Sequence, residues 1–124
     1  MEIAIAPEVM ASYRRTALAR EAARQQEAQC RRQAARSVAR RAARVLTEAF
    51  GATQVIAFGS LVHGAWFGPR SDIDLAVAGV PAEAFWHAWR ALDRLNPAFE
   101  IDLVAIESAP ERLHDEIMSQ GIAL

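Results

Sequence analysis

Between Pro7 and Gly51 the chain has no interior glycine or proline and is rich in Ala, Arg, Gln and Glu. These four residue types are strong helix formers, and glycine is common just past the last residue of a helix. The segment therefore predicts one helix over residues 7–50, which would be about 65 Å long if it is continuous. Because that length exceeds the width of a domain built from the remaining residues, part of the helix must project, fold back or pair with another chain.

Large apolar side chains occur only towards the two ends of this helix: Val9, Met10, Tyr13 and Leu18 at one end, and Val38, Val45, Leu46 and Phe50 at the other. A helix whose middle is polar nearly all round is not packed in a core along that stretch. We therefore expect only the last turns, with Val38, Val45 and Leu46, to dock on a folded body. This division predicts a helical arm over residues 1–43 and a domain over residues 44–124.

The arginines are concentrated in the same helix. Residues 14–44 carry a net charge of +8 and residues 45–124 carry −7, although the whole chain has a net charge of −1. Three interpretations are open: a solvated helix face, an electrostatic arm for RNA or another nucleic acid, and self-association in which the basic arm lies on the acidic body of a second subunit. The middle of the helix lacks the apolar seam of a stable coiled coil. Of the three interpretations, we favour contact with a partner or with a second subunit.

The rest of the chain alternates between strand-like and helical segments. The expected strands cover residues 54–58, 72–78 and 99–105. The expected helices are a short turn at 60–64, a helix opened by Pro81 and ending near Leu95, and a last helix that follows a capping box at 108–111 and stops before Gly121. With the long helix first, this order predicts a small β-sheet covered by helices, an α/β or α+β domain.

The segment 59–74 carries the strongest indication of chemistry. Gly59 and Ser60 follow one strand, and Asp72 and Asp74 project from the same face of the next, because residues i and i+2 of a strand share a face. Two adjacent carboxylates repel each other, and a bound divalent cation such as Mg²⁺ relieves that repulsion. Asp102, in the third strand, is a further candidate. Three carboxylates beside a Gly-Ser turn predict a metal-dependent nucleotidyl transfer site.

These residues lie in the runs Phe58-Gly59-Ser60, Ser71-Asp72-Ile73-Asp74-Leu75 and Ile101-Asp102-Leu103-Val104. In this order the runs resemble the DNA polymerase β-like nucleotidyltransferase superfamily, and within it the minimal nucleotidyltransferases of bacteria and archaea, over roughly residues 44–124. The resemblance implies a small mixed β-sheet and transfer of AMP or another NMP from ATP or another NTP to a hydroxyl group. It also implies that Gly59 and Ser60 hold the triphosphate, and that the catalytic residues Asp72, Asp74 and Asp102 bind two Mg²⁺ ions.

The resemblance also implies a partner. Many minimal nucleotidyltransferases are antitoxins of a small helical HEPN-type ribonuclease toxin, in some cases by adenylylating a toxin tyrosine. Two alternatives stay open: a non-catalytic antitoxin that blocks its toxin by contact, and nucleotidyl transfer to a small molecule. The chain departs from the usual pattern in having eleven residues rather than ten between Ser60 and Asp72, and in its arginine-rich helix, which is not part of the minimal core.

The remaining residues mainly exclude other kinds of site and location. The single cysteine, Cys30, excludes an internal disulfide and a multi-cysteine zinc site. No apolar run is long enough to cross a bilayer and no secretory signal is present, so we expect a cytoplasmic protein without a membrane partner. His63, Trp66 and Phe67 lie in the loop after Ser60, where a histidine could touch substrate and the aromatic residues could flank a nucleobase or a partner.

Overall fold

The computed structural model describes residues 5–63 and 67–124. Along the chain, helices and strands follow in the predicted order, with one 3₁₀ helix and one short strand in addition. The elements are α1 (Pro7–Phe50), β1 (Gln54–Phe58), α2 (Ser60–His63), β2 (Ile73–Ala78), α3 (Ala82–Leu92), β3 (Ile101–Ala105), the 3₁₀ helix η1 (Ile106–Ser108), α4 (Glu111–Gln120) and β4 (Ile122–Ala123).

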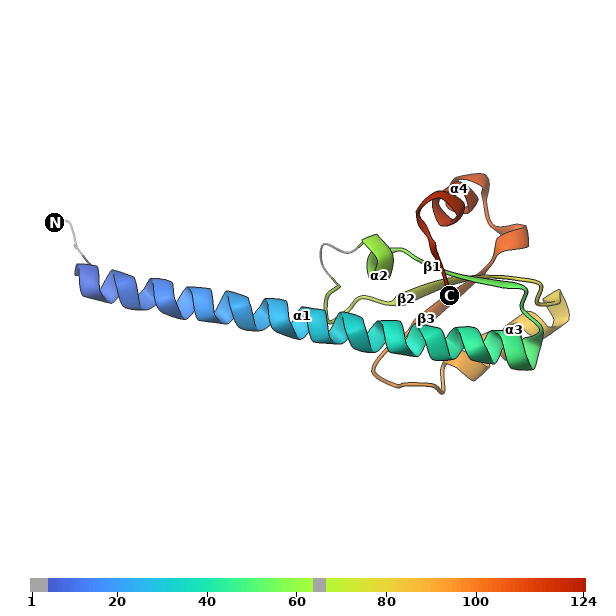
Figure 1. The fold of residues 1–124 in the computed structure, drawn as a ribbon, viewed down its shortest axis with the longest axis horizontal. Coiled ribbons are helices and arrows are strands. Elements are labelled where there is room, and N and C mark those ends of the chain that lie inside the picture. Colours follow the sequence, from blue (N-terminus) through green and yellow to red (C-terminus); the bar gives the residue numbers. More distant parts are fainter. Residues whose placement is uncertain (1–4, 64–66) are drawn as a thin grey trace.

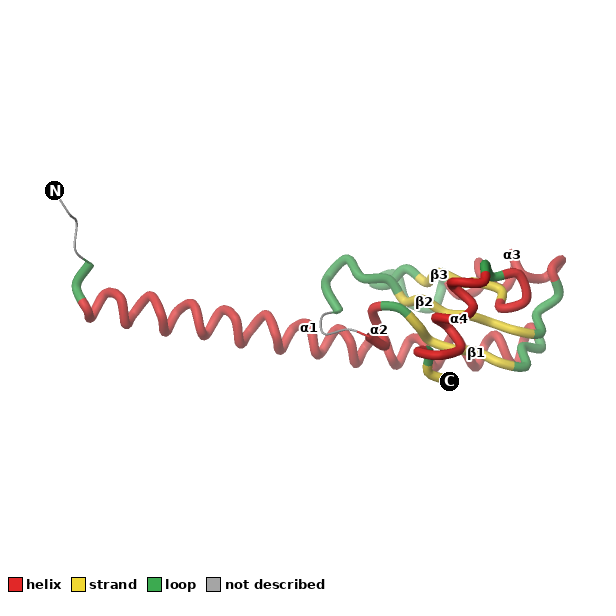
Figure 2. The backbone as a smooth tube through the Cα atoms, turned by 90° about the horizontal axis from the view of Figure 1, so that it is seen from above, coloured by secondary structure: helices red, strands yellow, loops and turns green. Residues whose placement is uncertain are grey.

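Helix α1 is continuous and has the predicted bounds. Pro7 occupies its first position, where a missing N–H costs nothing, and Gly51 ends it in the left-handed conformation at φ 73°. Figures 1 and 2 show α1 extending far beyond the body, so the amino-terminal end of the chain lies well away from the sheet. Among the described residues, no helix combines the length and the apolar character needed to cross a membrane.

The four strands form one mixed sheet in the order β3-β2-β1-β4. Strands β1 and β2 are antiparallel, as are β1 and β4, whereas β2 and β3 are parallel. Parallel strands need a crossover connection, and α3 supplies it between β2 and β3. The prediction of a small mixed sheet covered by helices, with a long helix at the amino terminus, is therefore confirmed.

Helices cover both faces of the sheet. The larger core joins the inner side of α1 and of α3 to one face, through buried residues that include Leu46, Leu92, Ile73, Leu75 and Leu103. A smaller core joins α4 to the other face through Ile56, Phe58, Ala76, Ile106 and Ile117. Figure 1 shows the corresponding arrangement, with α1 and α3 on one side of the strands and α4 on the other.

The docked part of α1 begins earlier than the sequence indicated. Val38 and Leu46 are buried as expected and Val45 is half-buried, but Ala35, Ala39 and Ala42 are completely buried as well. These alanines lie on one face of the helix and let its backbone approach the sheet closely. The pattern of large apolar residues does not indicate this contact, because alanine is small. Residues 7–27 are exposed throughout and form the projecting part of the helix.

Three local predictions need correction. Helix α3 ends at Leu92 rather than near Leu95, and Pro81 is its N-cap residue rather than its first helical residue. The capping box at 108–111 is wrong, because Ser108 ends η1 and Pro110 is the N-cap of α4 without a side-chain cap. Strand β4 was not predicted, since two residues after a helix carry no periodic signal of their own.

The alanine stripe of α1 provides a test of the docked arrangement. We expect Ala39→Leu to lower the free energy of unfolding by about 1–3 kcal/mol, because the larger side chain must separate α1 from the sheet. The matched control is Ala23→Leu in the exposed part of the same helix, which we expect to change stability by less than about 0.5 kcal/mol. Urea denaturation of both variants measures the difference, and equal stability would contradict the docking.

Candidate active site

The predicted site residues lie at one end of three adjacent strands. Gly59 and Ser60 directly follow β1, Asp72 immediately precedes β2, Asp74 is the second residue of β2 and Asp102 is the second residue of β3. Strand pairing places Asp74 beside Asp102 on the parallel neighbour and beside Phe58 on the antiparallel neighbour. Segments far apart in the sequence thus deliver all five residues to the same region of the sheet.

Asp74 and Asp102 project from the face that α4 covers. Ile73 and Leu75, which flank Asp74 in β2, belong to the core under α1 and α3, whereas Ala76 belongs to the core under α4. Because successive side chains of a strand alternate between faces, Asp74 shares the α4 face with Ala76, and its register partner Asp102 points the same way. Asp74 is half-buried there and Asp102 is exposed.

Both the backbone conformation at position 59 and the nearby Asp74 side chain require glycine there. Its φ of 71° is a left-handed value that costs other residues free energy, and a Cβ at this position would overlap the Asp74 carboxylate. The glycine therefore lets the turn after β1 lie directly against the acid in β2. This close approach joins the Gly59-Ser60 segment and the carboxylates into one site.

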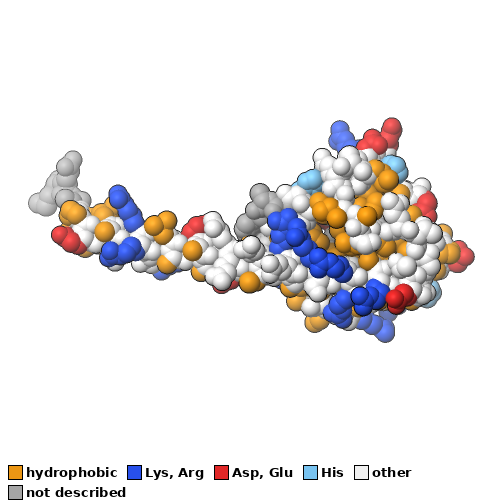
Figure 3. Space-filling view, viewed as in Figure 1, with side chains coloured by type: hydrophobic (Ala, Val, Ile, Leu, Met, Phe, Trp, Pro, Cys, Tyr) orange, Lys and Arg blue, Asp and Glu red, His pale blue; other side chains and the backbone are white. Residues whose placement is uncertain are grey.

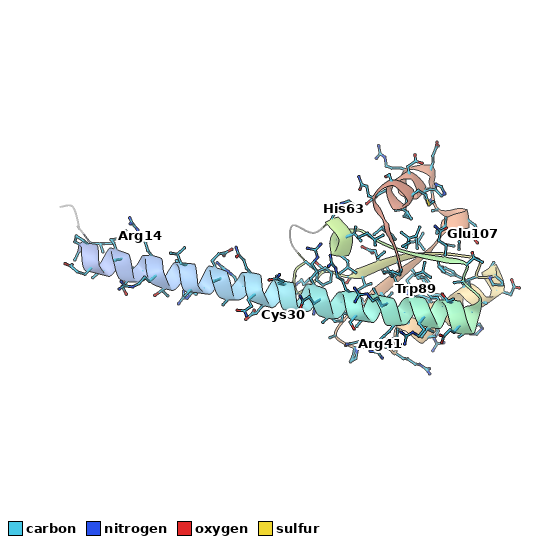
Figure 4. The ribbon with its side chains drawn as sticks, in the orientation of Figure 1. Arg14, Cys30, Arg41, His63, Trp89 and Glu107 are labelled. Atoms are coloured by element: carbon cyan, nitrogen blue, oxygen red, sulfur yellow. The ribbon has the colours of Figure 1, made fainter. Side chains whose placement is uncertain are left out.

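Helix α2 is a single turn held by the carbonyl of Gly59. The backbone N–H groups of Val62 and His63 both donate to that oxygen, at 3.1 and 2.9 Å. Ser60, at the start of the turn, is half-exposed, and His63, labelled in Figure 4, is exposed on the same short helix. Both side chains are therefore accessible from solvent beside the carboxylates.

The acids form a mutually repelling group. Burial, followed by repulsion from Asp102, Asp72 and Glu116, raises the pKa of Asp74 to about 6 from its ordinary value of 3.8. Glu116, on α4, was not among the predicted residues. No sequence signal marks it, because only the packing of α4 against β1 and the second core brings this helix over Asp74.

The three aspartate carboxylates suit a hard divalent cation, although their side chains do not converge as a complete set of metal ligands. Within residues 5–63 and 67–124, no three Asp, Glu, His or Cys side chains converge as ready-made metal ligands. The chemistry of the group nevertheless suits Mg²⁺, which prefers carboxylate oxygens and is bound by few protein ligands. Burial first, and then the neighbouring acids, disfavour the charged form of Asp74 and raise its pKa, and a bound cation would offset both effects. Asp72, Asp74 and Asp102 are the residues that could hold it.

An open groove of about 530 Å³ lies beside Asp102, with Trp86, Trp89 and Arg90 of α3 in its lining. Trp89, labelled in Figure 4, is half-buried and donates its indole N–H to the carbonyl of Ile101 at 2.7 Å. Trp86 is 61% exposed. A larger hollow of about 920 Å³ lies between α1 and Pro69, but none of the three aspartates lines it. Of these two hollows, only the groove has one of the three candidate aspartates, Asp102, in its lining.

The sequence suggested that Trp66 and Phe67, in the loop after Ser60, could flank a nucleobase or a partner, and the structure tests this only for Phe67. Phe67 is only 1% exposed and packs near Phe99, with ring centroids 6.4 Å apart, so its ring is not available to a nucleobase. Trp66 lies outside the described residues. The interpretation of Phe67 as a ligand contact is therefore wrong, because the ring is part of the core beneath α1.

The sequence profile described as polymerase beta, nucleotidyltransferase matches residues 42–124. No curated protein matches the chain. A solved structure described as a minimal nucleotidyltransferase shares 27% identity with it at a TM-score of 0.53, and the alignment covers 80% of this chain and 94% of that one.

Two further solved structures are toxin–antitoxin assemblies. One, described as a toxin–antitoxin with AMP-PNP, shares 25% identity at a TM-score of 0.55, over 67% of this chain and 69% of that one. The other is a tri-AMPylated Shewanella oneidensis HEPN toxin in complex with its MNT antitoxin. It shares 22% identity at a TM-score of 0.54, over 72% of this chain and 70% of that one, and at this identity it supports the fold alone.

The contact between Gly59 and Asp74 can be tested by comparing two glycines. Gly59→Ala and Gly51→Ala both place alanine at a positive φ, but a Cβ at Gly51 meets nothing within 4 Å. We expect Gly51→Ala to lower the free energy of unfolding by about 1 kcal/mol and Gly59→Ala to lower it further. The extra loss should largely disappear in the Gly59→Ala/Asp74→Ala double variant. Urea denaturation of the wild type, the two glycine variants, Asp74→Ala and the double variant measures this coupling, and additive effects of Gly59→Ala and Asp74→Ala would contradict it.

The raised pKa of Asp74 predicts a pH-dependent gain from Asp74→Asn in the metal-free protein. An acid whose pKa is higher in the folded state costs stability once it ionises, so the cost is absent below about pH 4 and complete above about pH 6. We expect the variant to match the wild type at pH 3.5 and to be more stable by about 1 kcal/mol at pH 7, since partial exposure weakens the effect.

Thermal unfolding in EDTA at both pH values measures this gain. Added Mg²⁺ should stabilise the wild type more than the variant, because the amide cannot replace the carboxylate as a charged ligand. A stability difference that does not change with pH would show that the pKa of Asp74 is not raised in the folded protein.

Proposed function

The chain belongs to the polymerase beta nucleotidyltransferase family, as its sequence motifs predicted, and we propose that it is an Mg²⁺-dependent nucleotidyltransferase. In this proposal it transfers NMP, with AMP as the first candidate, from an NTP to a hydroxyl group of a HEPN-type toxin. The protein would thereby act as the antitoxin of that toxin. The proposed reaction is that of a protein adenylyltransferase.

One observation carries the proposal: Asp74 and Asp102 lie in register on two parallel strands, with Gly59 pressed against the Asp74 carboxylate. This arrangement places the Gly59-Ser60 turn, which suits phosphate binding, next to aspartates that suit metal binding. Acids held side by side in neighbouring strands do nothing for the fold itself, because without a cation they repel each other. The pairing therefore favours an active enzyme over an antitoxin that acts by contact alone.

The residues have distinct roles in the proposed reaction. Gly59 allows the phosphates of the NTP to approach the backbone, and Ser60 lies at the start of the turn that would receive them. Asp72 and Asp74 hold the charge that positions the metal ions against the phosphates. Asp102 is exposed on the edge strand β3 and, in this proposal, completes the metal site near the acceptor hydroxyl.

Two Mg²⁺ ions, when bound, would stabilise the charge that grows on the attacking and leaving oxygens of an in-line displacement. The carboxylates that would hold them stand on or beside strands, which position ligands more rigidly than loops do. The similarity to a structure with AMP-PNP supports a nucleoside triphosphate as the donor. ATP is therefore the first nucleotide to test.

The partner is inferred from the related structures and from the surface beside Asp102. Toxin–antitoxin assemblies are prominent among the similar folds, and one of them contains an AMPylated HEPN toxin. The groove that Asp102 lines is open and carries an exposed Trp86, so another protein could contact the chain beside this edge-strand acid. A protein acceptor therefore agrees with both observations.

The test is intact-mass spectrometry of a HEPN-type protein encoded beside this one, after incubation with the chain, Mg²⁺ and each NTP in turn. We expect a mass gain of one or more NMP units on the toxin. Asp72→Ala and Asp74→Ala should abolish the gain while the variants remain folded, since removing one of several repelling acids costs the metal-free fold little.

The matched control is Asp115→Ala, which removes an exposed acid of α4 and should leave transfer unchanged. Full transfer by the Asp74→Ala variant would contradict the metal assignment. A stable complex without any mass gain would instead favour an antitoxin that acts by contact, and absence of both would favour a small-molecule acceptor.

A further inference from the structure

Two adjacent arginines of α1 donate hydrogen bonds to backbone carbonyls in three segments next to the candidate site residues. Arg31 and Arg32 belong to the long helix, before the region that the family profile matches, yet both are half-buried against the body. They differ in this from the arginines of the projecting arm, such as Arg14 in Figure 4, which are exposed.

Arg32 holds the turn that follows Gly59 and Ser60. Its guanidinium donates from Nε to the carbonyl of Leu61 at 3.3 Å and from the terminal nitrogen Nη2 to the carbonyl of Val62 at 3.5 Å. Leu61 and Val62 belong to α2, whose amide groups are in turn held by the Gly59 carbonyl. Arg32 therefore links α1 to the short helix α2.

Arg31 holds the segments that lead into the two acid-bearing strands. Its Nε donates to the carbonyl of Gly68 at 3.1 Å, and its Nη2 donates to the carbonyl of Ala98 at 3.2 Å. Gly68 and Ser71 close a turn directly before Asp72: the Ser71 N–H donates to the Gly68 carbonyl, and the Gly68 N–H donates to the Ser71 hydroxyl oxygen. Ala98 lies four residues before Asp102.

The Arg31 guanidinium is also fixed by aromatic rings. It lies 4.4 Å from the ring centroid of Phe99 and 5.8 Å from that of Phe67, and both rings are buried. A planar guanidinium can donate to two carbonyls while it stacks on a ring, which a lysine ammonium cannot do. The side chain is thus held in one position rather than moving freely in solvent.

We propose that Arg31 and Arg32 are positioning residues for nucleotide binding. Together they hold the turn after Gly59-Ser60, the approach to Asp72 and the approach to Asp102 in one arrangement, which makes part of α1 a component of the active site. This inference rests on the proposed function. Neither arginine needs to touch the nucleotide, because each acts through the backbone segment that it holds.

The test measures binding of AMP-PNP with Mg²⁺ to the full-length protein by isothermal titration calorimetry. The Arg31→Gln/Arg32→Gln variant should bind about tenfold more weakly, since the loss of charge-assisted hydrogen bonds leaves the three segments less well placed. The matched control is Arg36→Gln/Arg40→Gln, which removes the same charge from two exposed positions of the same helix and should change the affinity less than twofold.

Two further variants separate positioning from general stability. Arg32→Lys should recover part of the affinity that Arg32→Gln loses, because an ammonium can still donate to one of the two carbonyls. In the transfer assay, the positioning variants should raise the KM for the NTP and leave kcat within about twofold, since the carboxylates are unchanged. If the Arg31→Gln/Arg32→Gln protein does not fold, the affinities of Arg32→Gln and Arg32→Lys test the inference in its place.

The outcomes are distinguishable. Unchanged affinity in the Arg31→Gln/Arg32→Gln protein overturns the inference, and so does an equal loss in the control pair, which would indicate charge alone. A lower melting temperature with normal affinity would show a purely structural role and also overturns it. Failure of the wild type to bind AMP-PNP would overturn the proposed function itself, and the inference with it.

Discussion

The parallel pairing of β2 with β3 is the constraint on which the site depends. It places Asp74 and Asp102 next to each other on one face of the sheet, where burial raises the pKa of Asp74 and repulsion from Asp102 raises it further. Such an arrangement costs stability in the absence of a cation. The rest of the domain is large enough to maintain it, because both faces of the sheet are covered by helices and the other residues of β2 are apolar.

The long helix has two physically different parts. From Ala35 to Leu46 its alanine-lined face packs on the sheet as an integral piece of the core. Residues 7–27 are exposed, and Figure 3 shows Arg side chains both along this projecting part and where the helix passes the body. Between the two parts, Arg31 and Arg32 join the helix to the loops of the site. The role of the exposed arm, whether in self-association or in contact with nucleic acid, stays a prediction.

Much of the fold could be predicted from periodicity and from helix-ending residues. The bounds of α1 and β1 follow from Pro7, Gly51 and the apolar run before Gly59, and the structure has the same limits. The errors occur where local signals are weak or compete. Ser108 and Glu111 suggested a capping box, but Pro110 is the N-cap of α4, and β4 is two residues long and depends on pairing with β1.

The sequence alone proposed Gly59, Ser60, Asp72, Asp74 and Asp102 as site residues, through a glycine before a turn, acids two residues apart and the family resemblance, and their roles stay a prediction. It also indicated the family, which the profile match confirms. Only the tertiary structure showed that Gly59 must lack a side chain because of Asp74, that Glu116 joins the acids, and that Arg31 and Arg32 hold the surrounding segments. Those relations join residues from different elements, and no local pattern encodes a contact that exists only after the helices have packed on the sheet.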